Sequence, residues 1–162
     1  MNNGLFITFE GGEGSGKTTQ IALLSDYLVS KSYKVYVTRE PGGSIGAESI
    51  RNLLVTGNPD KWDSETEALL MYAARRDNYM RVIKPNLNEG RIVISDRFSD
   101  STKVYQGIVG GVPQEKINLL HNFCLDNFQA DLTFILDIDV KKGLSRANLR
   151  KGNENRFESK GI

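Results

Sequence analysis

A glycine-rich loop near the start of this chain joins an apolar run to an amphipathic segment. The loop, residues 11–18, reads G-G-E-G-S-G-K-T and matches the pattern G-x-x-x-x-G-K-[S/T] without exception. The six residues before it, L-F-I-T-F-E, are typical of a buried strand. Residues 17–31, after it, carry apolar side chains at helical spacing. A strand before the loop and a helix after it form the context that this motif requires.

Short apolar runs and helical patterns continue to alternate along the chain. Further strands are predicted at 34–38, 91–95 and 132–137, and further helices at 45–56, 64–87, 113–128 and 140–150. Ser64 and Glu67 have the spacing of a capping box, and Pro85 is expected to bend or stop the helix that they open. Continuous apolar strands that alternate with helices predict an α/β fold, with a parallel sheet covered by helices on both faces.

Composition limits the class of protein. The chain has 162 residues, 39% of them hydrophobic and 25% charged, so we expect one globular domain over residues 1–162. The formal net charge of +1 gives no reason to expect a nucleic-acid partner. No apolar stretch approaches the ~18 residues of a membrane span, and the N-terminus lacks signal-peptide features, so a cytoplasmic protein is expected.

The chain has a single cysteine, Cys124, and a single histidine, His121. One cysteine cannot form an internal disulfide or a thiolate zinc cluster, and one histidine cannot form a catalytic pair. We expect Cys124 to be a small core residue and His121 to have a surface or packing role.

The glycine loop predicts a binding site for nucleotide phosphates. Glycines let successive backbone N–H groups point inward, and the following helix adds its positive N-terminus. The Lys17 ammonium is expected to reach the β- and γ-phosphates, and the Thr18 hydroxyl is a suitable ligand for Mg²⁺. The residues expected to bind the phosphates of a nucleoside triphosphate are Gly11, Gly12, Glu13, Gly14, Ser15, Gly16, Lys17 and Thr18. A carboxylate in an anion-binding loop is costly unless it is paired, so Glu13 should have a cationic partner.

Several nucleotide-binding classes fit poorly. The chain lacks the N-K-x-D motif that reads guanine, which disfavours a regulatory GTPase, and it is small for a motor or transporter ATPase. A small kinase with a second, acceptor site fits best. Arg39 follows the second predicted strand, and Asp96 and Arg97 follow the third, so all three should meet at the carboxyl edge of the sheet. Arginine suits phosphate oxygens, and the aspartate is placed for a second contact to Mg²⁺.

Five later segments carry a family resemblance. They are T-R-E-P-G-G (38–43), L-L-M-Y-A-A-R (69–75), V-I-K-P-N-L (82–87), D-R-F-S-D-S-T-K-V-Y-Q-G (96–107) and N-R-F-E (155–158). Together they resemble the thymidylate kinases, of the bacterial type with basic residues in the lid, over residues 5–158. The resemblance implies a P-loop nucleoside monophosphate kinase fold. It also implies a homodimeric enzyme that converts ATP and dTMP to ADP and dTDP with Mg²⁺, in dTTP synthesis.

The resemblance also implies roles for individual residues. Glu13 would organise the acceptor sugar and the nearby arginines. The residues implied at the dTMP site are Arg39 and Arg97 for the phosphate, Arg75 for a thymine carbonyl, Tyr105 against the sugar, and Thr102 and Gln106 beside the base. Met71 stands where the family commonly has an aromatic residue stacked on thymine, and Phe98 stands where a tyrosine or histidine is common.

The last basic stretch resembles a lid, at about residues 146–160. Arg146, Arg150 and Arg156 are its arginines, and Asn155 replaces the usual aspartate. We expect Arg150 to stabilise the transferring phosphoryl group, which makes Lys17, Glu13, Arg97 and Arg150 the expected catalytic residues.

Two alternatives stay open on the sequence. One is another small P-loop kinase that acts on a different nucleoside monophosphate. The other is a nucleotide-binding chain that does not turn over, because the family continues past the lid with further helices and a strand. We expect those last elements of the fold to be absent from this sequence, which would leave residues 132–137 as an exposed sheet edge.

Overall fold

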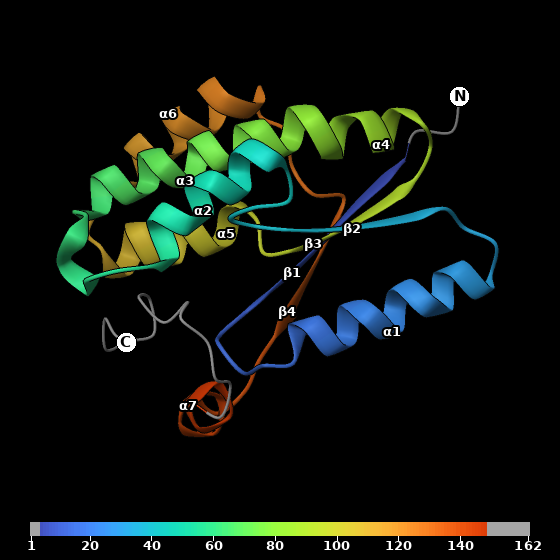
Figure 1. Cartoon of the computed structure of the whole chain (residues 1–162), viewed down its shortest axis with the longest axis horizontal. Helices are drawn as coiled ribbons and strands as arrows, with labels where there is room; N and C mark the ends of the chain where they lie inside the picture. The colour runs from blue at the N-terminus through green and yellow to red at the C-terminus, as the bar shows by residue number, and fades with distance from the viewer. Residues whose placement is uncertain (1–3, 149–162) are drawn as a thin grey trace.

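The computed structural model describes residues 4–148, and its centre is a sheet of four parallel strands (Figure 1). The strands are β1 (Leu5–Gly11), β2 (Val35–Arg39), β3 (Ile92–Asp96) and β4 (Leu132–Leu136). Their order across the sheet is β2-β3-β1-β4, so β1 lies inside the sheet with the glycine loop at its end. The predicted parallel sheet is confirmed, with strand ends that differ from the prediction by one residue.

Helices cover both faces of the sheet, as predicted. Ile7 is aligned with Ile94 of the neighbouring strand, and both pack against Ile21 of α1 (Lys17–Ser30). Phe6 and its neighbour Val93 point to the opposite face, because side chains alternate along a strand. Figure 1 shows α1 below the sheet, with α7 near the end of β4, and the layer of α2 to α6 above it.

The helical layer comes from several separate parts of the chain. Its elements are α2 (Ile45–Val55), η1 (Pro59–Lys61), α3 (Ser64–Asn78), η2 (Tyr79–Ile83), α4 (Lys84–Asn88), α5 (Ser99–Thr102), η3 (Lys103–Val109) and α6 (Gln114–Leu125). The last described element is α7 (Val140–Asn148). Cys124 and His121 lie buried in α6, as their packing roles predicted. Within residues 4–148, no helix is long and apolar enough to cross a membrane.

Pro85 does not stop the long helix. Helical structure continues from Ser64 to Asn88, with a π-helical turn at Tyr79–Ile83 just before the proline. Proline has no N–H to donate, and its ring crowds the carbonyl four residues back. The wider π turn accommodates the ring at this point, so the chain remains helical.

The predicted capping box is wrong by one residue. The N-cap of α3 is Asp63, and a carboxylate oxygen of Asp63 accepts a hydrogen bond from the backbone N–H of Thr66. Asp63 is as good a cap as serine, and its use moves Ser64 into the first helical turn. Glu67 is therefore not the box glutamate. Its side chain is buried on the cleft side of the helical layer.

The helical segment Ser99–Val109, made of α5 and η3, has no predicted counterpart. Its buried residues include Ser99, Thr102 and Gln106, which are polar. A pattern of apolar residues therefore cannot reveal it. This segment follows Arg97 directly and forms one wall of the cleft described next.

Candidate functional site

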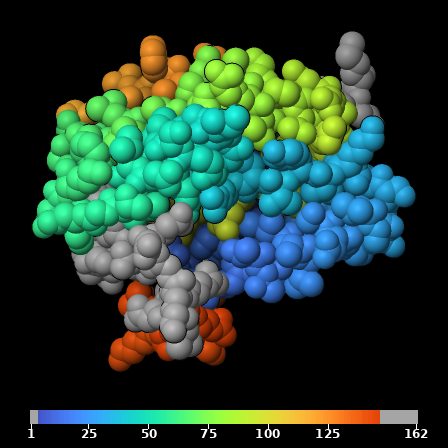
Figure 2. Space-filling model, in the orientation of Figure 1, coloured from blue at the N-terminus to red at the C-terminus, as the bar shows by residue number. Residues whose placement is uncertain are grey.

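The carboxyl ends of β1, β2 and β3 open into one cavity of about 370 Å³. Figure 2 shows the surface hollowed between the blue start of the chain and the cyan-to-green helices. The lining residues include Glu13 to Thr18, Arg39, Arg51, Met71, Arg75, Asp96, Arg97, Thr102, Tyr105 and Gln106. The structure thus brings residues of the expected ATP site and of the expected dTMP site into a single cleft.

The glycine loop has the backbone that an anion cradle requires. Gly14 and Gly16 have φ angles of 71° and 95°, values that a side chain at Cβ disfavours, and Gly16 caps α1. The ammonium of Lys17 donates hydrogen bonds of 2.9 Å to the carbonyls of Gly11 and Gly12. Burial, reinforced by the nearby cation of Arg97, lowers the pKa of Lys17 below its ordinary value. The cation is therefore held at the loop by its backbone rather than by solvent.

Thr18 and Asp96 meet at the mouth of the loop. The Thr18 hydroxyl donates to a carboxylate oxygen of Asp96 over 3.3 Å. Both are hard oxygen ligands of the type that Mg²⁺ takes. No cluster of three or more acidic, histidine or cysteine side chains that could hold a metal is found among residues 4–148. The pair fits a Mg²⁺ ion that takes its other ligands from phosphate and water.

The partner expected for Glu13 is Arg97. The two side chains form an ion pair across the cleft, between the glycine loop and the end of β3. Arg97 also donates to the Ser101 hydroxyl over 2.9 Å, and its guanidinium lies 5.4 Å from the centre of the Tyr105 ring. The φ of Arg97 is 71°, in the left-handed region that non-glycine residues seldom adopt. Three side chains and an unusual backbone turn therefore fix this guanidinium in the cleft.

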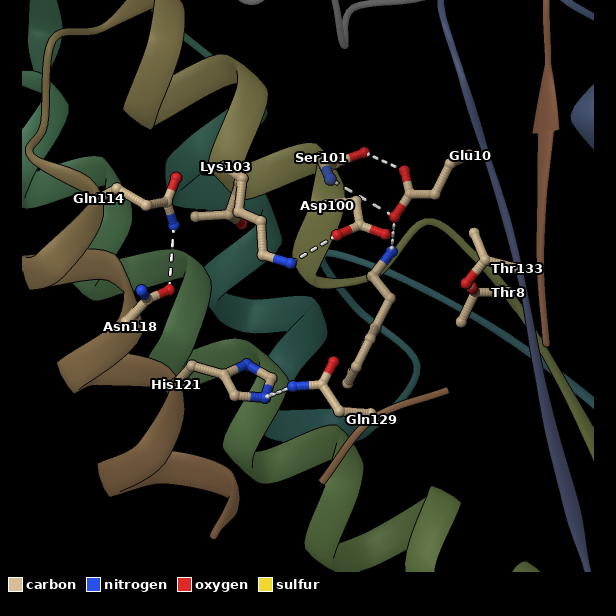
Figure 3. Close-up of polar contacts among 12 residues, drawn as sticks. Thr8, Glu10, Asp100, Ser101, Lys103, Gln114, Asn118, His121, Gln129 and Thr133 are labelled. Carbon is tan, nitrogen blue, oxygen red and sulfur yellow. Dashed lines mark hydrogen bonds and ion pairs between the residues drawn. The ribbon is translucent and has the colours of Figure 1, made fainter. Parts of the chain in front are cut away.

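Glu10 is a site residue that the sequence reading missed. One oxygen of its buried carboxylate accepts from the backbone N–H of Phe98 over 2.8 Å, and the other accepts from the Ser101 hydroxyl over 2.6 Å. Figure 3 shows Glu10 and Ser101 facing each other from β1 and α5. The carboxylate thus anchors the start of the helical segment behind Arg97. The sequence signal for this was strand alternation, because it places Glu10 on the same covered face of the sheet as Phe6.

Arg75 is buried in the floor of the cleft. Its Nε donates to Glu40 over 2.6 Å, and its Nη2 donates to the Phe98 carbonyl and the Thr102 hydroxyl over 3.0 Å each. Its guanidinium also lies over the Tyr72 ring, 4.6 Å from the ring centre. Burial is the largest single effect and disfavours the charged form, but Glu40, Tyr72 and Glu10 together outweigh it and raise the pKa of Arg75. Arg75 Nη1 has no partner in the described structure.

Two further arginines line the outer part of the cleft. Arg39 is half-exposed and forms an ion pair with Glu48, at 2.9 Å. Arg51, which the sequence reading missed, donates to the carbonyl of Pro41 over 2.7 Å. Arg51 lies on α2 one turn after Glu48 and lines the same cavity, but no local signal in the sequence pointed to it, because the pairing of Arg39 with Glu48 is visible only in the structure.

Gln106 closes the inner wall of the cleft. Its Nε2 donates to Glu67 over 3.1 Å, while its Oε1 is buried without a partner in the described structure. Met71 and Tyr105 line the same cavity. Tyr72, the neighbour of Met71, is instead buried beside His121 in the core.

The helix α7 lies close to the glycine loop. A side chain at Gly14 would stand 2.2 Å from the carbonyl oxygen of Gly143 and 3.1 Å from Cβ of Arg146. Arg146, the first expected lid arginine, is therefore beside the loop. Arg150, Arg156 and Asn155 lie outside the described residues.

Comparisons with known proteins agree on one family. The family model described as thymidylate kinase matches residues 9–162. A thymidylate kinase of Caulobacter vibrioides is 54% identical over 162 residues, which are 100% of this chain and 77% of that protein. One of Ruegeria pomeroyi is 51% identical over 98% of this chain and 74% of its own length. The crystal structure of an Ehrlichia chaffeensis thymidylate kinase aligns with a TM-score of 0.78 and 41% identity, over 97% of this chain and 86% of that one.

Proposed function

The chain belongs to the thymidylate kinase family, and we propose how its cleft carries out that family's reaction, the ATP-dependent phosphorylation of dTMP to dTDP. One observation carries the proposal: a single cavity holds the glycine loop at one end and four arginines with a polar inner wall at the other. Donor and acceptor phosphates can therefore meet within it.

On the donor side, the backbone of residues 11–18 and the Lys17 ammonium hold the ATP phosphates. A Mg²⁺ ion would be held by the Thr18 hydroxyl and by Asp96, directly or through water. When bound, it would neutralise charge on the β- and γ-phosphates. Because Lys17 is buried, its attraction for the phosphates is little screened by water.

On the acceptor side, Arg97 binds the dTMP phosphate together with Arg39 and Arg51. Arg97 is the central member because Glu13, Ser101 and the Tyr105 ring all fix its position. Tyr105 packs against the sugar where a ribose 2′-hydroxyl would lie, and so selects deoxyribose by exclusion. These roles rest on the positions of the side chains in the cleft and on the family resemblance.

The base occupies the inner end of the cleft. Arg75 donates to a thymine carbonyl through Nη1, which has no partner among residues 4–148, and Thr102 and Gln106 lie beside the ring. Met71 covers the face of the ring with a polarizable thioether in place of an aromatic stack.

Phosphoryl transfer needs positioning and positive charge rather than a strong base, because the attacking group is already a phosphate anion. Lys17 and Arg97 lie on the two sides of the reacting group, and Glu13 keeps Arg97 oriented between them. Arg150 is proposed as the lid arginine that completes the charge, with Arg146 and Arg156 as the other lid residues. The position of Arg146 beside Gly14 supports a lid at this end of the cleft.

We also propose a homodimer formed through α3 and α6. Leu69 on α3 and Leu119 and Phe123 on α6 are exposed, as is Met80 on η2 directly after α3, and Phe123 has 86% of its surface accessible. Exposed apolar side chains in this number favour an interface. Phe123→Glu should then convert the dimer to monomers in sedimentation velocity. A wild type that already sediments as a monomer would contradict the proposal.

A cytoplasmic location stays a prediction.

The test of the catalytic proposal is ADP release with dTMP as acceptor, with and without Mg²⁺. Lys17→Ala and Arg97→Ala should each abolish turnover while circular dichroism and the unfolding midpoint stay near those of the wild type. A panel of nucleoside monophosphates, including dCMP, UMP and AMP, should show dTMP as the preferred acceptor. Near-normal turnover by Arg97→Ala would contradict the acceptor assignment, and chelation of Mg²⁺ without effect would contradict the metal site.

A further inference from the structure

Two buried polar atoms in the cleft wall have no partner in the part of the chain that the structure describes. They are Arg75 Nη1, a hydrogen-bond donor, and Gln106 Oε1, an acceptor. Thr102 joins their surroundings, because it accepts from Arg75 and lies one helical turn before Gln106. An unpaired buried polar group destabilises the site, so a ligand that satisfies both atoms is favoured.

The complementary ligand has a carbonyl next to an N–H group. The imide edge of thymine has this pattern, with O4 as acceptor and N3–H as donor. Cytosine presents the reverse, since its 4-amino group donates and its N3 accepts. Arg75 can only donate, so its half of the pattern cannot be reversed.

Gln106 could in principle read either base. A glutamine side chain can rotate its amide by half a turn and present oxygen or nitrogen to the cleft. In the structure its Nε2 donates to the Glu67 carboxylate over 3.1 Å, and the two side chains are 1% and 2% exposed. The rotated amide would place its oxygen against a carboxylate oxygen, where neither atom can donate. Glu67 therefore holds Gln106 with its oxygen available.

We propose that Glu67 is a positioning residue that sets the choice of thymine over cytosine by fixing the orientation of the Gln106 amide. The inference rests on the proposed place of the base between Arg75 and Gln106. It also gives a reason for the buried position of this carboxylate, on the first turn of α3 and against Gln106, where removal from water has a cost that an exposed carboxylate does not have.

The test compares dTMP and dCMP as acceptors for the wild type and for Glu67→Gln. A glutamine at this position can accept or donate, so the Gln106 amide becomes free to rotate. The ratio of kcat/KM for dTMP to that for dCMP should fall about tenfold or more, the effect of one buried hydrogen bond that is no longer assured. The change should come mainly from a higher KM for dTMP, with kcat little affected, because no reacting atom is touched.

Two further variants separate orientation from general damage. Glu65→Gln is the matched control, because Glu65 lies two residues away on the same helix, is exposed and pairs with Lys116; its ratio should not change. The double variant Glu67→Gln/Gln106→Glu exchanges amide and carboxylate while keeping the hydrogen bond and the volume. A carboxylate at position 106 can only accept, so the double variant should regain the preference for dTMP.

A folded Glu67→Gln variant with the wild-type dTMP-to-dCMP ratio would overturn the proposal, as would a double variant that discriminates no better than the single one. If Glu67→Gln does not fold, the double variant alone provides the test. It should prefer dTMP over dCMP only if the orientation of the side chain at position 106 causes that preference. Calorimetry measures the affinity of the cleft for dTMP and for dCMP in the absence of turnover. A wild type that binds dTMP over dCMP but releases no ADP would contradict the proposed catalysis and leave this inference supported.

Discussion

Replacement of Glu40 by glutamine would leave the guanidinium of Arg75 buried without its carboxylate. The two groups are 2.6 Å apart, and their side chains are only 2% and 3% exposed. Arg75 would keep its hydrogen bonds to Phe98 and Thr102, but neither partner carries a charge. An arginine cannot lose its proton to escape this situation. Loss of one partner of a buried ion pair costs about 3–5 kcal/mol, and we expect the lower end, about 3 kcal/mol, because the glutamine can still accept one hydrogen bond.

Urea unfolding measures this loss directly. With a dependence of about 1–3 kcal/mol per molar urea, a loss of about 3 kcal/mol lowers the midpoint by about 1–3 M. In thermal unfolding it lowers Tm by about 6–12 °C for a chain of this size. Glu65→Gln is the control, because Glu65 and Lys116 are also 2.6 Å apart but are 58% and 56% exposed. That change should cost less than about 1 kcal/mol.

The comparison isolates burial, since the two pairs have the same separation. If Glu40→Gln and Glu65→Gln shift the urea midpoint equally, burial does not increase the contribution of an ion pair to the free energy of unfolding, and the reasoning is wrong. The double variant Glu40→Gln/Arg75→Met removes the stranded cation as well. It should be more stable than Glu40→Gln alone, because an apolar side chain of similar length suits the site better than an unpaired charge. A double variant less stable than the single one would equally refute the argument.

Two other predictions follow from contacts behind the cleft. Ser101→Ala removes the hydroxyl that links Glu10 to Arg97, so the KM for dTMP should rise several-fold while the KM for ATP changes little in initial-rate kinetics; equal rises in both would contradict the link. Burial lowers the pKa of His121 below its ordinary 6.5, so the unfolded chain binds more protons than the folded one just below that pH. The free energy of unfolding should therefore fall as the pH falls below about 6.5, and His121→Gln should flatten that part of the pH profile in urea unfolding; an identical profile for wild type and variant would contradict it.

Much of the fold was predictable because its signals are local. The strands are short apolar runs, and the glycine loop carries its own backbone requirements, so neither depends on distant residues. The helical segment Ser99–Val109 is different. Its cleft-facing positions are occupied by polar residues, and it is held by the Glu10 carboxylate from β1, which is 91 positions away from Ser101. Apolar periodicity cannot reveal a helix whose buried side chains are polar and are held by hydrogen bonds.

In the candidate site, too, residues with local sequence signals could be predicted and residues placed by distant contacts could not. Lys17, Thr18, Asp96 and Arg97 could be located because each follows a strand or belongs to the loop. The position of Glu67 could not, because local rules gave it a plausible role in a capping box. Asp63 takes the cap one residue earlier, and the contact of Glu67 with Gln106, 39 positions later, decides where its carboxylate lies. Such a contact depends on the packing of α3 against η3, which no short segment of sequence encodes.

The π-helical winding of Lys103–Val109 makes this wall sensitive to the length of the chain. In a π-helix each N–H bonds to the carbonyl five residues back, as Gly110 does to Tyr105. Deletion of one residue there would let the segment rewind as an α-helix. Successive side chains within the segment would then take the α-helical spacing of about 100°, which differs from their spacing in the π turn. Tyr105 and Gln106 would keep their chemistry but lose their common direction, so an insertion or deletion here would alter substrate choice without any substitution.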